Sequence, residues 1–193
     1  RLVRSTATKR GVFKIGSDGL YRAPAPITLW ALQKAIQGAP RCPWSASGFA
    51  RGLRGYLLDR ITALHSTEFS IHHVAGFAGT CDLLADVKEP GTDTPKLTIV
   101  DYKTTGKSIH SKIAGQYDNY RAQLGAYSLG LRARTGIQAE AGALVIARRS
   151  GAPQEIWLTK EELLQEETNF LERVETFLST IEIDSQEPHT TEQ

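Results

Sequence analysis

A short run, Lys96-Leu97-Thr98-Ile99-Val100-Asp101-Tyr102-Lys103-Thr104-Thr105, begins with apolar and β-branched residues and ends in charged and polar side chains. This pattern is typical of a buried strand that delivers polar groups to the edge of a sheet. Side chains alternate along a strand, so Asp101 and Lys103 point to one face and Tyr102 points to the other. We therefore expect a carboxylate and an ammonium group to share one pocket.

A second strand is predicted just upstream, over Gly76–Val87, and the turn-rich segment Lys88–Pro95 joins the two strands. A hairpin between them would bring Asp82 beside Asp101. Two carboxylates and a lysine would then meet at one point. Carboxylate oxygens are preferred ligands of hard divalent cations, and such a cation can activate a water molecule. The two strands together therefore predict a candidate metal site.

Three motifs with fixed internal spacing follow one another along the chain, namely Gly79-x-x-Asp82, Asp101-x-Lys103 and Gln123-x-x-x-Tyr127. In this order, on two strands and a helix, they resemble the RecB-like branch of the PD-(D/E)XK nuclease superfamily. Within that branch the likeness is to the mitochondrial genome maintenance exonuclease and its phage and bacterial relatives, over about Glu68 to Leu178. The resemblance implies an α/β fold with a central mixed β-sheet flanked by helices, like the core of restriction endonucleases.

The resemblance also implies a metal-dependent deoxyribonuclease. Asp82 and Asp101, together with the backbone carbonyl of Tyr102, would hold Mg²⁺ or Mn²⁺ through oxygen ligands. Lys103 would orient or deprotonate the attacking water and neutralise the charge that develops on phosphorus. Cleavage would leave a 5′-phosphate, as it does in this superfamily.

Three further residues join the candidate site. Gln123 and Tyr127 are four residues apart, so they share one face of the predicted helix. The resemblance implies that this face packs over the metal site and that both side chains touch the scissile region. Glu68 stands where the resembled exonucleases have a glutamate that leads into a strand, so it is a second-tier candidate. The structural alternative is a simply exposed glutamate at a strand end.

One motif of the resembled nucleases is absent from its expected place. Many RecB-like nucleases carry Gly-x-x-x-His on the helix that corresponds to Ser45–Leu64, and that histidine reaches the metal site. Here Gly52 places Tyr56 at the histidine position. His65, just past the helix, is a candidate substitute, with a surface histidine as the alternative. A nucleic-acid-binding or assembly module without hydrolytic activity is therefore the alternative function.

Periodicity divides the remaining chain into helices and strands. Apolar residues at helical spacing predict helices near Ile27–Gln37, Ser45–Leu64, Asp118–Arg134 and Thr159–Ile181. Alternation and turn residues predict strands over Glu68–Ala75, Gly76–Val87, Leu97–Lys103, Ala141–Arg148 and Gln154–Leu158. We expect Asp118 to be the N-cap of its helix.

The last predicted helix carries two further signals. It begins with the capping box Thr159-Lys160-Glu161-Glu162. Its apolar residues are expected to form a stripe that faces the core, made of Leu163, Phe170, Val174, Phe177, Leu178 and Ile181.

The composition is that of one globular domain, with 193 residues of which 40% are hydrophobic and 23% charged. We expect an N-terminal arm and first helix packed on the core over residues 1–44, a nuclease core over 45–184 and a flexible tail over 185–193. No apolar run approaches the ~20 residues of a membrane span. Cys42 and Cys81 are too few for a zinc or iron–sulfur site. An intracellular, reducing setting is expected, with a bacterial or phage-infected cytoplasm favoured and an organelle left open.

Positive charge gathers in the first third of the chain, where residues 1–60 hold eleven lysines and arginines against two acids. A basic surface on a candidate nuclease suits a phosphate backbone. Candidate contacts are Arg51 and Arg54 on the predicted helix and Lys107 and Lys112 in the polar stretch after Lys103. The expected partner is DNA, with single-stranded ends favoured, alongside replication or recombination proteins. An exonuclease in DNA repair, recombination or replication is favoured over an endonuclease, and the oligomeric state stays open.

Overall fold

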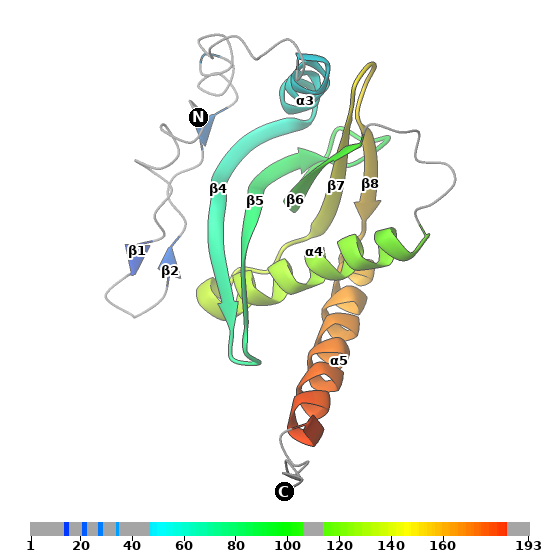
Figure 1. Cartoon of the computed structure of the whole chain (residues 1–193). Coiled ribbons are helices and arrows are strands. Elements are labelled where there is room, and N and C mark those ends of the chain that lie inside the picture. Colours follow the sequence, from blue (N-terminus) through cyan, green and yellow to red (C-terminus); the bar gives the residue numbers. More distant parts are fainter. Residues whose placement is uncertain are drawn as a thin grey trace, which may run out of the picture.

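The computed structural model describes residues 14–15, 21–22, 27–28, 34, 47–105 and 114–184. Its main feature is a six-stranded sheet with helices on both faces (Figure 1). In spatial order the strands are β3 (Ile27–Thr28), β4 (Ile61–His73), β5 (Phe77–Lys88), β6 (Pro95–Thr105), β7 (Ala141–Arg148) and β8 (Gln154–Leu158). The helices are α3 (Ser47–Arg60), α4 (Ala114–Thr135) and α5 (Lys160–Asp184). Two short strands, β1 (Lys14–Ile15) and β2 (Tyr21–Arg22), form a separate antiparallel pair.

The sheet is mixed, because one of its strand pairs is parallel. β4, β5 and β6 form an antiparallel meander, β6 and β7 run parallel, and β7 and β8 form an antiparallel hairpin. Parallel neighbours need a long crossover, and α4 lies within the one between β6 and β7. The predicted fold class, a central mixed sheet flanked by helices, is confirmed. The bounds predicted for the strands β7 and β8 coincide with those of the structure.

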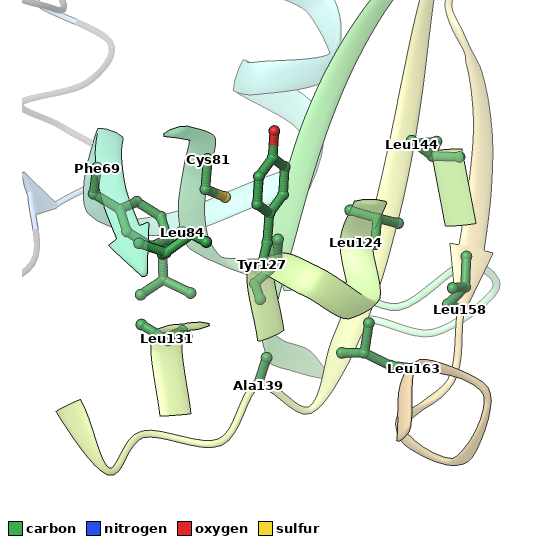
Figure 2. Close-up of a cluster of buried hydrophobic side chains, with 12 residues drawn as sticks. Phe69, Cys81, Leu84, Leu124, Tyr127, Leu131, Ala139, Leu144, Leu158 and Leu163 are labelled. Atoms are coloured by element: carbon green, nitrogen blue, oxygen red, sulfur yellow. The ribbon is translucent and has the colours of Figure 1, made fainter. Parts of the chain in front are cut away.

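Buried side chains form two clusters, one on each face of the sheet. On one face, under α4 and α5, Leu124 of α4 and Leu163 of α5 lie in one cluster (Figure 2). Ile99 of β6 belongs to the same cluster. On the other face, under α3, Tyr56 belongs to a cluster with Val100 of β6. Ile99 and Val100 are neighbours in the sequence, so β6 alternates between the two faces as predicted. Residues Asp101 and Lys103 then fall on the face that α4 covers.

The β4–β5 hairpin is distorted at one position. Glu68 has a φ of 47°, in the left-handed region that residues other than glycine rarely occupy. The strand pairs on either side of it place Glu68 opposite Asp82. The alternation of β5 breaks at the same point, because Cys81 and Leu84 lie in one buried cluster and Leu83 lies in the other. At Asp82, therefore, the side chains of β5 depart from regular alternation between the two faces of the sheet.

The prediction of a helix over Ser45–Leu64 is wrong at its C-terminal end. α3 ends at Arg60, and Ile61 already begins β4, where it pairs with Val87. Ile61 and Leu64 continue the helical spacing of the apolar residues, which is why the sequence favoured a longer helix. Both side chains are buried in the cluster under α3, so strand and helix contribute to the same apolar layer. β4 consequently begins well before the predicted start of this strand at Glu68.

Two other predicted helix starts are wrong. Ile27 and Thr28 do not open a helix, because they form β3 and pair with β4. Within the rest of the helix predicted there, the structure describes only Lys34, which is helical. α4 already includes Ala114, so Asp118 lies inside the helix and is not its N-cap.

The core-facing stripe predicted for α5 is also wrong over its second half. Phe177, Leu178 and Ile181 are 65%, 46% and 45% exposed. The physical reason is that α5 continues beyond the sheet, so its C-terminal turns extend past the apolar layer that the sheet provides (Figure 1).

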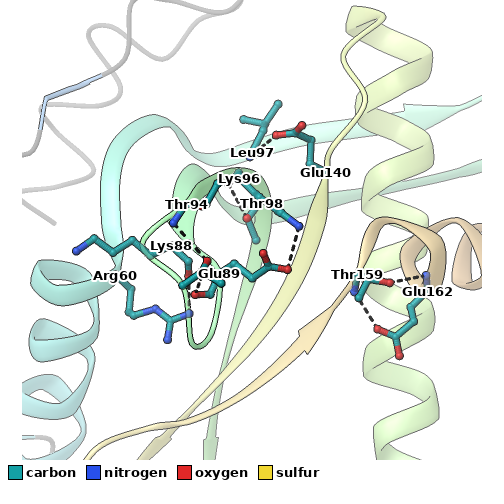
Figure 3. Close-up of polar contacts among 11 residues, drawn as sticks. Arg60, Lys88, Glu89, Thr94, Lys96, Leu97, Thr98, Glu140, Thr159 and Glu162 are labelled. Carbon is teal, nitrogen blue, oxygen red and sulfur yellow. Dashed lines mark hydrogen bonds and ion pairs between the residues drawn. The ribbon is translucent and has the colours of Figure 1, made fainter.

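The capping box at the start of α5 is confirmed. The backbone N–H of Thr159 donates to Oε2 of Glu162 at 2.8 Å, and the backbone N–H of Glu162 donates to Oγ1 of Thr159 at 3.3 Å (Figure 3). These reciprocal bonds satisfy two donors that the first helical turn leaves unpaired. They fix the point at which the chain turns from β8 into α5.

The expected division into arm, core and tail stays a prediction, since residues 1–44 are described only at isolated positions and residues 185–193 lie outside the described part. Over the described ranges, no helix combines the length and the apolar character that a membrane crossing requires.

Candidate active site

The two candidate aspartates lie where β6 separates from β5. Leu83 pairs with Val100, and this is the last pair between β5 and β6. Asp82 and Asp101 are the next residues of the two strands in that register. Beyond this point β6 continues beside β7 alone, as far as the pair formed by Thr105. The antiparallel pairing of β5 and β6 confirms the predicted hairpin, and its register confirms that Asp82 and Asp101 are neighbours.

A hydrogen bond holds Asp82 at this fork. Its Oδ2 atom accepts the backbone N–H of Tyr102 at 2.8 Å. Because β6 has left β5 here, the carboxylate takes the place of a ladder partner for that N–H group. Asp82 is thereby oriented toward the residue between Asp101 and Lys103.

A continuous chain of polar contacts runs from β6 to α4. Nζ of Lys103 lies 2.5 Å from Oδ2 of Asp101 in an ion pair. The same ammonium donates to Oε1 of Gln123 at 2.9 Å, and Nε2 of Gln123 donates to the hydroxyl of Tyr127 at 2.5 Å. The structure thus brings together Asp101, Lys103, Gln123 and Tyr127, as the sequence predicted.

Tyr120 is a member of this group that the sequence reasoning missed. Nζ of Lys103 lies 4.9 Å from the centroid of the Tyr120 ring, within the range of a cation–π interaction. Tyr120 precedes Gln123 by one helical turn, so helical spacing could have placed both on the face that meets Lys103. The aromatic ring and the Gln123 amide hold the lysine from two directions.

Burial sets the protonation behaviour of the site. Asp101 is only 2% exposed, and burial raises its pKa above the usual range; Lys103 opposes this shift and the charge of Asp82 adds to it. Burial and the charge of Asp101 raise the pKa of Tyr127 to about 12. At neutral pH the Tyr127 hydroxyl therefore keeps its proton. Figure 2 shows this hydroxyl directed away from the apolar residue Leu163.

The donor set fits a divalent cation. The carboxylates of Asp82 and Asp101 and the carbonyl of Tyr102 are oxygen ligands, which Mg²⁺ and Mn²⁺ prefer. Two neighbouring carboxylates, one of them buried, repel each other and favour a positive ion between them. Among the described residues, no group of three or more histidines, cysteines and acids is arranged to hold a metal. Glu68 therefore does not complete a three-carboxylate site in this arrangement, and its role stays a prediction.

Neither candidate for the missing histidine lies in the polar chain. Tyr56 is buried under α3, on the face opposite α4, and its hydroxyl donates to Oε1 of Glu155 at 2.7 Å. Nε2 of His65 lies 2.9 Å from Oδ1 of Asp86, in a half-buried pair further along the β4–β5 hairpin. Both side chains thus have structural partners on the sheet.

The two predicted DNA contacts on α3 lie on a different part of the surface. Arg51 and Arg54 are exposed on α3. Arg51 and Arg149 line a groove of about 920 Å³ between α3 and the β7–β8 turn. The role of the two α3 arginines in DNA binding stays a prediction, and Lys107 and Lys112 lie outside the described residues.

Comparison with known proteins agrees with this geometry at the level of the family. A model of the PD-(D/E)XK nuclease superfamily matches residues 25–190. No curated protein matches the chain at a significant level. Among solved structures, the chain is similar to the crystal structure of a "putative exonuclease" from Eubacterium rectale, with 16% sequence identity and a TM-score of 0.45. The alignment covers 92% of this chain, which spans 58% of the length of that protein.

The family match extends over most of the chain and includes every candidate site residue. The chain belongs to the PD-(D/E)XK nuclease superfamily. The RecB-like branch and the likeness to the mitochondrial exonuclease stay predictions.

Proposed function

We propose that this protein is a Mg²⁺- or Mn²⁺-dependent DNA nuclease whose active site is the fork between β5 and β6. One observation carries the proposal: Lys103 bridges the buried Asp101 and Gln123 beside the point where Asp82 holds the Tyr102 amide. The charge of Asp82 raises the pKa of Asp101 and so opposes its ionisation. A second carboxylate at this position would therefore weaken a salt bridge whose role was only to stabilise the fold. Such an arrangement becomes favourable when a cation joins it.

The metal would be held by Asp82, Asp101 and the carbonyl of Tyr102. When bound, it would supply positive charge to the scissile phosphate and lower the pKa of a water molecule. Lys103 places its positive charge and its remaining N–H beside the attacking water and the phosphate oxygens, where it orients the water and neutralises the negative charge that develops. The oxygen of water bonds to phosphorus and the P–O3′ bond breaks. The water releases one proton to the solvent, and the 3′ oxygen takes one up.

Gln123 and Tyr127 position these groups from α4. The amide oxygen of Gln123 accepts a hydrogen bond from the Lys103 ammonium and so orients it, and the amide nitrogen of Gln123 donates to the Tyr127 hydroxyl. The Tyr127 hydroxyl accepts from Gln123 and remains protonated at neutral pH, so it is free to donate its own proton toward a phosphate oxygen. Glu68, opposite Asp82, is a second-tier positioning residue for that aspartate.

We further propose that the enzyme digests single-stranded DNA from its ends during DNA repair, recombination or replication in an intracellular setting. The support is the ordered motif set, which resembles exonucleases of the RecB-like branch. Basic residues on α3, Arg51 and Arg54, would hold the phosphate backbone away from the chemistry.

Two variants test the chemistry by separating metal binding from catalysis. Asp101→Asn keeps the shape of the side chain and removes the charge, so cleavage should fall to background and Mn²⁺ affinity measured by titration calorimetry should be largely lost. Lys103→Ala should abolish cleavage and retain most of the Mn²⁺ affinity. Full cleavage by Asp101→Asn, with contaminating nuclease excluded, would refute the assignment.

A substrate series tests the mode of attack. End-labelled single strands, duplexes and covalently closed single-stranded circles are incubated with the purified protein, with and without Mg²⁺. An exonuclease for single strands should digest the linear single strand and leave the circle intact. Cleavage of the circle would instead identify an endonuclease.

The alternative is a module on the same fold that binds nucleic acid without cutting it. The observation in its favour is Tyr56, which occupies the histidine position of the resembled nucleases and is tied to Glu155. This alternative predicts DNA binding without metal-dependent cleavage by the wild-type protein. It also predicts that Asp101→Asn and Lys103→Ala leave the affinity of the protein for DNA unchanged.

A further inference from the structure

A small pocket opens beside the candidate active site, on the face of the sheet that α4 covers. Its volume is about 330 Å³, and its walls come from the end of the β4–β5 hairpin, from α4 and from α5. Gln123 and Tyr127 belong to its lining. Since Gln123 accepts a hydrogen bond from Lys103, the pocket and the polar chain of the site share a wall.

Among the described residues that line the pocket, three are aromatic, namely Phe77, Tyr127 and Phe170. Phe77 of β5 and Phe170 of α5 meet edge to face, with centroids 4.8 Å apart. Outside the lining, His73 supports Phe77 by stacking on it, with centroids 5.1 Å apart and an interplanar angle of 19°. Tyr127 packs directly over Gly79, because a Cβ at that glycine would lie 3.3 Å from the ring. These contacts hold the rings in place before any ligand enters.

The polar groups of the pocket favour an anionic ligand. Arg173 of α5 is exposed in the lining, and its Nη1 donates to Oδ1 of Asn119 at 3.0 Å, which fixes the guanidinium against α4. None of the described residues that line the pocket is acidic. A ligand with an apolar, planar part and a nearby negative charge therefore matches both the rings and the arginine.

We propose that this pocket binds the base of an unpaired nucleotide next to the scissile phosphate. A nucleobase presents a flat face to aromatic rings, and its own phosphate lies within reach of a cation at the pocket mouth. A base within a duplex is stacked and paired, so it could not enter without unwinding. The pocket thus provides selection for single strands within the active site itself. This inference rests on the proposed nuclease function.

The proposal is tested with single-stranded oligonucleotides in which one nucleotide at a time is replaced by an abasic residue. Binding is measured by fluorescence anisotropy in EDTA, so the readout does not depend on cleavage. We expect one position to lose roughly 5- to 150-fold in affinity, the range for loss of one base–aromatic stack. The same position should slow digestion when Mg²⁺ is present.

Two variants locate the effect. Phe170→Ala should bind intact and abasic strands equally, with the melting temperature reported alongside to verify folding. Phe177→Ala is the matched control, since Phe177 lies on the same helix, is 65% exposed and is outside the pocket lining. It should retain the full discrimination.

The outcomes separate the two proposals. Equal affinity for all abasic positions in the wild-type protein, or full discrimination retained by Phe170→Ala, would refute the base pocket. If the protein cleaves DNA but binds intact and abasic strands equally, the nuclease proposal is supported and only the base pocket is refuted. If the protein binds intact strands more tightly than abasic strands but shows no metal-dependent cleavage, the base pocket is supported and the nuclease proposal is refuted.

Discussion

Replacement of Gly125 by alanine tests how α4 is held over the site. Gly125 lies between Gln123 and Tyr127 on α4, where that helix meets α5. An added Cβ would lie 2.4 Å from the carbonyl carbon and oxygen of Glu166 and 2.7 Å from the backbone nitrogen of Glu167. These are backbone atoms of α5, so no side-chain rotation relieves the contact. The two helices must move apart.

The magnitude follows from two opposing effects. Alanine is favoured over glycine in a helix by about 1 kcal/mol. Overpacking of a close interface costs about 1–3 kcal/mol, and the upper part of that range applies when backbone atoms collide. We expect Gly125→Ala to lower the free energy of unfolding by about 1–2 kcal/mol. At about 2–4 °C per kcal/mol for a domain of this size, the melting temperature should fall by roughly 2–8 °C.

Urea unfolding and thermal melting in EDTA provide the measurement, and Gly55→Ala is the matched control. Gly55 lies within α3, and no described atom would come within 4 Å of an added Cβ there. The control should gain up to about 1 kcal/mol of stability from helix propensity alone. If Gly125→Ala were as stable as the wild type or more stable, the close approach of α4 to α5 would be refuted.

Three further predictions concern charge and capping. Asp101→Asn should stabilise the metal-free protein at neutral pH, because the folded state raises the pKa of Asp101 and so binds more protons than the unfolded state. The difference in free energy of unfolding between the variant and the wild type should therefore grow as the pH rises from below the pKa of Asp101 in the unfolded chain to above its pKa in the folded protein. Urea unfolding from pH 4 to 8 measures this difference, and a constant or shrinking difference would contradict the prediction. Arg51→Gln combined with Arg54→Gln should weaken DNA binding and flatten the slope of log affinity against log salt, since fewer counterions are released; an unchanged slope would place these arginines away from the DNA. Thr159→Ala removes the hydroxyl that caps the Glu162 N–H and should cost about 0.5–2 kcal/mol in the free energy of unfolding, with an unchanged urea midpoint as the contrary result.

The sequence by itself determined the features that depend on local periodicity. The alternation along β6 placed Asp101 and Lys103 on one face and Tyr102 on the other, because strand side chains alternate regardless of what surrounds them. Helical spacing likewise placed Gln123 and Tyr127 together. The motif order predicted that residues from two strands and one helix would lie together at the candidate site, and the capping box marked where α5 begins.

The tertiary structure decided what depends on segments far apart in the sequence. α3 ends at Arg60 because the next apolar residues, Ile61 and Leu64, are buried as part of the sheet, a choice that spacing alone cannot make. The second half of α5 exposes its apolar stripe because the sheet beneath it ends. Phe77 and Phe170 meet only when the hairpin and α5 pack together, since contacts between distant segments depend on the folded arrangement and not on local pattern.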